Sequence, residues 1–170
     1  MKRTFFISII ALAVLAMPMF SSCSSYDGNT TFAVQAMYKS TWYWVGYAED
    51  GEYTQVGTGE GDPLYRVSFS EGRMDGAAPT AGFYADDVII SGNKIHFKNF
   101  VCEEGYCTDP KWSKYLNMIS RISSFDIRED GLLQLSVTED SYLLFTATRG
   151  SKTTFFDEEH LKELGLELTK

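Results

Sequence analysis

The feature that most limits the possible folds is a series of short segments rich in aromatic and β-branched residues, most of which alternate apolar with polar side chains. They occur at residues 41–47, 64–69, 88–90, 94–98, 125–127, 133–137 and 142–145. A period of two is typical of β-strands, because successive side chains point to opposite faces of a sheet. Turn signals such as Ser91-Gly92-Asn93 and Asp130-Gly131 separate neighbouring segments. Strands joined by close turns pair antiparallel, so the sequence predicts an antiparallel sheet.

One segment departs from this pattern and predicts a helix. Asp109 precedes Pro110, which is typical of an N-cap followed by the first helical residue. Large apolar residues then recur at helical spacing, at Trp112, Tyr115, Leu116, Ile119 and Ile122. We therefore expect an α+β fold, with a mostly antiparallel, strongly curved, barrel-like β-sheet and one packed helix near residues 110–122.

The first residues have the pattern of an export signal. Lys2 and Arg3 give a positive start, an almost wholly apolar run follows from Phe5 to Phe20, and small residues precede Cys23. This order defines a signal peptide. The apolar run is shorter than the roughly 20 residues that a helix needs to span a bilayer. A cleaved signal therefore explains the segment better than a permanent membrane anchor.

Ser21-Ser22-Cys23 resembles the lipobox of bacterial lipoproteins, although Phe20 and Ser22 stand where Leu and Gly or Ala are commonest. We expect residues 1–22 to be the signal peptide and Cys23 to carry acyl chains that bind membrane lipid, since each buried methylene contributes about 0.8 kcal/mol. The predicted location is the bacterial cell envelope, at the periplasmic face of the outer membrane or at the cell surface. The alternative is an ordinary signal peptide followed by a chance cysteine.

The mature chain divides into three expected parts. Residues 23–36 are expected to form a flexible tether, because Ser24 to about Thr31 is polar. Residues 37–148 hold the predicted strands and helix, with a loop rich in Gly, Glu and Asp from Ala48 to Pro63. Residues 149–170 are expected to be a C-terminal tail with a short helix.

With these elements in order, residues 37–148 resemble the META domain family, which includes HslJ-like heat-shock lipoproteins. The resemblance depends on the order of short motifs: Thr41-Trp42-Tyr43-Trp44, Phe69, Arg73-Met74-Asp75-Gly76, Gly82-Phe83-Tyr84, Cys107-Thr108-Asp109-Pro110, Phe125-Asp126-Ile127, Gly131-Leu132-Leu133-Gln134-Leu135 and Tyr142-Leu143-Leu144-Phe145. Family members often carry Cys-Asn after the Gly segment, where this chain has Ala77-Ala78-Pro79. The resemblance implies a role in envelope stress or in ligand or partner binding, and it brings no catalytic residues.

Two cysteines remain once Cys23 is acylated. Cys102 and Cys107 form an even pair in an oxidising compartment, which favours a disulfide. The loop that it closes is short, so the chain-entropy model gives a stabilisation of only about 2 kcal/mol. A weak metal site with His96 is the alternative, although zinc would need two more ligands from Glu103 and Glu104.

Charge and motif content narrow the function classes. Loss of Lys2 and Arg3 takes the net charge from -8 to -10, which argues against nucleic acid as a partner. We expect no enzyme activity and no cofactor, because the sequence lacks a G-x-S-x-G elbow and a phosphate-binding loop. Two alternatives stay open. One is a subunit of a surface protein complex, in contact with an envelope protein partner. The other is a hydrolase or metal-dependent enzyme that uses Asp86 and Asp87, or Cys102 and His96.

Overall fold

The structure is a computed structural model that describes residues 28–57, 64–103, 109–149, 156, 158–163 and 165–169. Three helices lie in this part of the chain: α1 (Gly28–Lys39), α2 (Pro110–Ile119) and α3 (Glu158–Glu163). The strands are β1 (Thr41–Glu49), β2 (Glu52–Gln55), β3 (Arg66–Ser70), β4 (Gly72–Ala78), β5 (Ala81–Ser91), β6 (Lys94–Cys102), β7 (Ser124–Ile127), β8 (Leu133–Ser136), β9 (Ser141–Thr146) and β10 (Glu167–Leu168).

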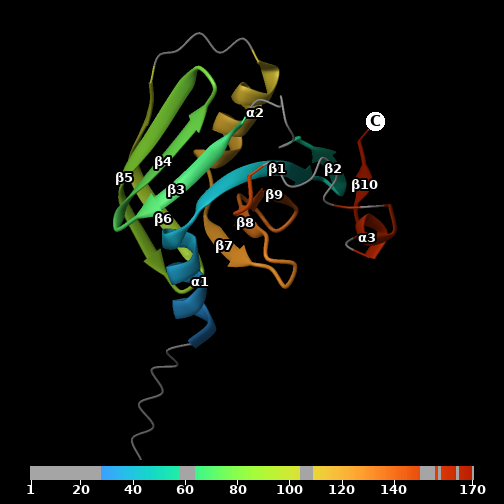
Figure 1. Ribbon diagram of the computed structural model, residues 1–170, viewed down its shortest axis with the longest axis horizontal. Helices are drawn as coiled ribbons and strands as arrows, with labels where there is room; N and C mark the ends of the chain where they lie inside the picture. The colour runs from blue at the N-terminus through green and yellow to red at the C-terminus, as the bar shows by residue number, and fades with distance from the viewer. Residues whose placement is uncertain are drawn as a thin grey trace, which may run out of the picture.

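The strands form one strongly curved sheet that closes on itself (Figure 1). From β3 to β9 each ring strand pairs with the next along the chain, and β1 joins the two ends. One edge of β1 pairs with β3 through Thr41–Tyr43, and its other edge pairs with β9. Every described pairing is antiparallel except that of β10 with β2. The predicted α+β class and the curved, mostly antiparallel sheet are therefore confirmed.

Alternation along each strand sends one set of side chains into the ring. Trp42 and Trp44 of β1, Val67 and Phe69 of β3, and Met74 of β4 are buried there, and the period of two predicted this for β3. Most of these residues are large and apolar, and aromatic rings contact one another at close range. The Trp44 ring, for example, lies 5.3 Å from that of Tyr65 and 5.0 Å from that of Tyr115, measured between centroids.

Helix α2 packs its aromatic face against this core. Asp109 caps the helix as predicted, because its side chain accepts a hydrogen bond from Lys111 N at 2.9 Å, and Pro110 begins the first turn. Trp112 and Tyr115 are buried, and the Tyr115 hydroxyl donates to the backbone oxygen of Arg66 at 3.0 Å. The helix ends at Ile119, three residues before the end at 122 that the apolar spacing predicted.

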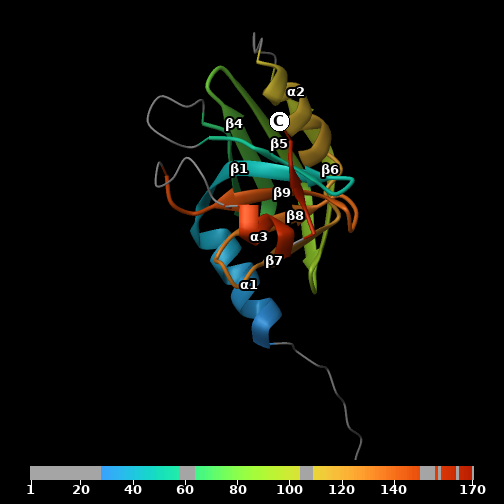
Figure 2. The same ribbon diagram turned by 90° about the vertical axis from the view of Figure 1, so that its right-hand side faces the viewer.

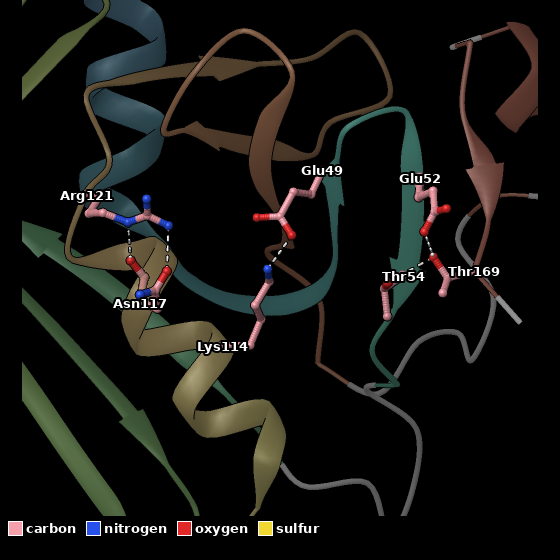
Figure 3. A network of polar contacts seen from close by, with 7 residues as sticks. All are labelled: Glu49, Glu52, Thr54, Lys114, Asn117, Arg121 and Thr169. Atoms are coloured by element: carbon pink, nitrogen blue, oxygen red, sulfur yellow. Dashed lines mark hydrogen bonds and ion pairs between the residues drawn. The ribbon is translucent and has the colours of Figure 1, made fainter.

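Polar contacts join α2 to the sheet and hold the end of the helix (Figure 3). Lys114 forms an ion pair with Glu49 at the end of β1, and its ammonium group lies 5.0 Å from the centroid of the Tyr47 ring. Just after the last turn, Arg121 Nε donates to the backbone oxygen of Asn117 at 2.9 Å. One end of the ring is thus covered by a helix that is held by both packing and charge.

Helix α1 corrects the expected tether. Residues 28–36 are helical, not flexible, and the helix continues to Lys39. Ala33, Val34 and Met37 recur at helical spacing and pack on the core, with Met37 fully buried. The Trp42 indole also donates to the backbone oxygen of Met37 at 3.1 Å. α1 lies at the end of the ring opposite the first turn of α2 in both views (Figures 1 and 2).

The C-terminal residues and β2 form a second, smaller core outside the ring. Val45 and Tyr53 face Phe156, Leu161 and Leu166 there, and all five are buried. The expected loop at residues 48–63 thus contains β2, and the expected tail joins the sheet through its short helix and β10. Thr169 contacts Thr54 at 3.3 Å and Glu52 at 3.4 Å, which links the two strands (Figure 3).

In the part of the chain that the structure describes, no helix is both long and apolar enough to cross a membrane.

Candidate functional site

The outer face of β1, β3, β4 and β5 carries a polar surface with charged side chains. Register places its outward side chains in rows that cross the strands. One row runs Thr41, Ser68, Asp75 and Tyr84; the next runs Tyr43, Arg66, Ala77 and Gly82; a third runs Ser70, Arg73 and Asp86. Neighbouring positions in a row are close enough for their side chains to interact directly.

A groove crosses this face at Ala77 and Gly82, the smallest residues of the second row. Two adjoining hollows share Asp75, Gly76 and Ala77, and they have volumes of about 310 Å³ and about 420 Å³. Arg66 borders the first hollow, and Tyr84 and Glu103 border the second. We call this surface the outer groove. Each hollow alone reaches the lower part of the range of small-molecule sites, which usually measure about 300–1,000 Å³.

Glycine keeps the groove open at one point in particular. A Cβ atom on Gly82 would lie 2.8 Å from Oε2 of Glu103, so a larger side chain would displace that carboxylate or fill the floor. The backbone at this position is also fixed, because Glu103 N donates to the Gly82 oxygen at 2.9 Å. Ala77 lies opposite Gly82 across the β4–β5 pairing, so two small residues form the floor together.

Opposite charges lie at the two sides of this floor. Arg66 projects from β3 and Glu103 follows the end of β6, and both are exposed. Neither side chain forms an ion pair with any other described residue. A ligand in the outer groove would therefore meet an available guanidinium on one side and an available carboxylate on the other, with Tyr84 and Asp75 between them.

A charged network supports one rim of the outer groove. The Arg73 guanidinium pairs with Asp75 and with Asp86, each at 2.9 Å, and lies 4.4 Å from the centroid of the Tyr84 ring. Hydrogen bonding to Asp75 and the nearby Asp86 charge raise the pKa of Arg73 further above its ordinary value. These contacts hold the Tyr84 ring and the Asp75 carboxylate in place at the edge of the groove.

The predicted cysteine pair stays a prediction. Cys102 ends β6 and is an exposed, free cysteine in the structure, whereas Cys107 lies outside the described residues. Partial desolvation of the thiol and the neighbouring Glu103 carboxylate raise the pKa of Cys102. A raised pKa disfavours the thiolate that either a nucleophile or a zinc ligand requires.

The alternative groups are not brought together as a catalytic or metal site. His96 lies six residues before Cys102 on the same strand, a separation of roughly 20 Å at about 3.3 Å per residue. Asp86 is engaged by Arg73, and Asp87 is an exposed residue with a φ of 54° at a break in the β5–β6 register. Among the described residues, no group of three or more His, Cys, Asp or Glu side chains is placed to hold a metal ion.

The site that the structure does assemble was not identified from the sequence. Arg66, Asp75, Gly82 and Glu103 lie in four separate segments, and no short motif joins them. Asp75, Gly82 and Tyr84 belonged to motifs that the resemblance highlighted, but Arg66 did not. The available signal was alternation along residues 64–69, which put Arg66 on the outward face of β3. Cys23, the predicted lipidation site, lies outside the described residues.

Comparison with known proteins adds the fold and no function. No family model matches the chain, and no curated protein matches it. The structure is similar to the NMR structure of a protein from Burkholderia xenovorans, with a TM-score of 0.51 and 17% sequence identity. The match covers 69% of this chain and 86% of the other. The chain thus shares its curved, sheet-rich fold with that bacterial protein.

Proposed function

We propose that the chain is a lipid-anchored protein of the bacterial cell envelope, held to membrane lipid through acylated Cys23. The support is the order of a charged start, an apolar run and small residues before Cys23. Mass spectrometry of the protein from its native membrane tests this directly. The expected result is a mature chain that begins at Cys23 and carries acyl chains. An unmodified Cys23 would overturn the anchor.

We further propose that the domain is a barrel of the META type and that it binds a ligand in the outer groove without catalysing a reaction. The observation that carries this proposal is the pairing of an available Arg66 with an available Glu103 across a floor of Ala77 and Gly82. A short peptide is the ligand class that fits. It can offer a carboxylate to Arg66, an ammonium group to Glu103, and backbone groups to Asp75 and Tyr84.

A binding titration with a library of charged tripeptides tests the groove, using the chain from Ser24 onward. Arg66→Ala and Glu103→Gln should each weaken binding of the best peptide by about tenfold or more, since a hydrogen bond to a charged group contributes about 1.5–3 kcal/mol. Gly82→Val should abolish binding by filling the floor.

Ser70→Ala is the matched control, because Ser70 shares the outer face of β3 with Arg66 but does not border either hollow. This substitution should leave affinity unchanged. Equal affinity for the parent and Gly82→Val would place the binding site elsewhere. Hydrolysis of any peptide during the titration would favour the enzyme alternative.

A role in envelope stress and a role as a complex subunit can be separated in cells. The resemblance to HslJ-like lipoproteins supports the first role, in which a peptide exposed by damaged envelope proteins would occupy the groove. Crosslinking in intact cells, before and after envelope damage, distinguishes the two roles. A partner captured only after damage supports the stress role. One protein captured equally in both conditions supports the complex.

A further inference from the structure

Two large apolar side chains remain exposed near one end of the molecule. Phe32 of α1 is 70% exposed and Ile89 of β5 is 59% exposed, the two highest exposures among the large apolar residues described. The β5–β6 turn lies at the end of the ring where α1 begins, and both views agree on this (Figures 1 and 2). Phe32 lies on the face of α1 opposite Met37, which packs into the core.

Lysines lie near these two exposed apolar residues, in a chain that is acidic overall. Residues 28–39 and 88–98 contain Lys39, Lys94 and Lys98, and neither segment contains Asp or Glu. The chain as a whole carries a net charge of -8. Glu71 also lies at this end, close to Tyr38 of α1 and next to Gly72, which pairs with Val88 of β5. Exposed Phe and Ile beside Lys are nevertheless the kind of side chains that enter the interface of a bilayer.

The start of the chain limits how far this end can lie from a membrane. Five residue steps separate Cys23 from Gly28, and they span at most about 18 Å when fully extended. Phe32 follows Gly28 by four helical residues, a rise of about 6 Å along the axis. An acyl group on Cys23 therefore keeps α1 close to the lipid surface whatever path the intervening residues take.

We infer that this end docks on the bilayer, with Phe32 and Ile89 inserted among the lipid headgroups and the upper acyl chains. The inference rests on the proposed anchor at Cys23. Docking in this way points the opposite end of the ring away from the membrane. The outer groove borders the β4–β5 turn at that opposite end, so it would face the aqueous compartment and remain open to a ligand (Figure 1).

Fluorescence quenching by lipid tests the orientation. The full acylated chain is placed in phosphatidylcholine vesicles in which part of the lipid carries bromine on its acyl chains. Phe32→Trp and Ile89→Trp report on the docked end, and Lys111→Trp, in the exposed first turn of α2, is the matched control. The native Trp42, Trp44 and Trp112 are buried, so the unsubstituted protein supplies the background to subtract.

Tryptophan at positions 32 and 89 should be quenched at least twofold and shifted to shorter wavelength, and tryptophan at 111 should be unaffected. Equal quenching at all three positions, or none at 32 and 89, would overturn the docking while leaving the anchor intact. An unacylated Cys23, seen by mass spectrometry, would instead remove the anchor and the docking with it.

A second copy of the chain is the competing occupant of this surface. Sedimentation equilibrium of the chain from Ser24 onward tests it, because every described element lies beyond residue 27. A monomer at all concentrations supports the bilayer. A dimer that Phe32→Ser dissociates would overturn the inference in favour of self-association.

Discussion

Gly76 of β4 offers a sharp test of the packing inside the ring. Its missing side chain would point inward, where a Cβ atom would lie 2.0 Å from Cζ and 2.1 Å from Cε1 of Phe83. The Phe83 ring cannot shift easily, because it is 2% exposed and its centroid lies 5.0 Å from that of Phe100 and 5.8 Å from that of Tyr115. The methyl group of Gly76→Ala would therefore overlap the Phe83 ring, and the packed core leaves that ring little room to move.

The expected cost is about 1–3 kcal/mol of the free energy of unfolding, the range found when a methyl group is added to a well-packed core. Replacing glycine within a strand would by itself be favourable by roughly 0.5–1 kcal/mol, so any net loss comes from the clash. Gly82→Ala is the matched control on the outward side of the next strand. Its new Cβ would meet only the end of the flexible Glu103 side chain at close range, so the effect should be neutral or favourable by up to about 1 kcal/mol.

Urea unfolding followed by tryptophan fluorescence measures both variants. The same Gly76→Ala substitution in a Phe83→Leu background should cost much less, because the smaller side chain leaves room for the methyl group. The reasoning fails if Gly76→Ala and Gly82→Ala unfold at the same urea concentration. It also fails if Gly76→Ala costs as much in the Phe83→Leu background as it does in the parent chain.

Three further predictions concern α2 and the loop before it. Trp112→Ala should lower the free energy of unfolding by about 3–5 kcal/mol, since the indole is buried, and an unchanged melting temperature would contradict its place in the core. The hydrogen bond from the Tyr65 hydroxyl lowers the pKa of Asp109 below its ordinary 3.8. The ionised Asp109 carboxylate should therefore stabilise the fold fully above the ordinary pKa, and this stabilisation should be lost as the pH falls through the lowered pKa. The free energy of unfolding of Asp109→Asn between pH 2 and 5 should then vary less with pH than that of the parent chain. Cys102 and Cys107 should resist alkylation under oxidising conditions and react after reduction, and two thiols that react without reductant would count against the disulfide.

Local patterns were enough to predict the elements that alternate or cap clearly. Asp109-Pro110 and the apolar spacing after it predicted α2, and the alternation around Val67 predicted β3, because burial on one face leaves a periodic signal. β1 is less regular. Val45 and Gly46 are both buried beside a register shift against β9, since this strand packs on the ring core and on the second core.

Contacts between residues distant in the sequence could not be predicted from local patterns. Nothing near Tyr43 indicates that it pairs with Thr146, and nothing near Gly82 indicates that Glu103 will lie beside it. Helix α1 was missed because few of its residues face the core, so its polar surroundings resembled a tether. The outer groove depends on register between strands, and register is fixed by the closed sheet as a whole.

Ring closure also has a kinetic consequence. β1 begins near residue 41 and its partner β9 ends at Thr146, so about a hundred residues must be available before the second edge of the first strand is paired. Contacts this distant in sequence form slowly, because closing so long a loop costs entropy before the β1–β9 pairing compensates for it. A chain synthesised from its N-terminus therefore keeps one edge of β1 unpaired until almost the whole domain has been made. During that interval the aromatic strand that begins the fold is the part most exposed to wrong pairing.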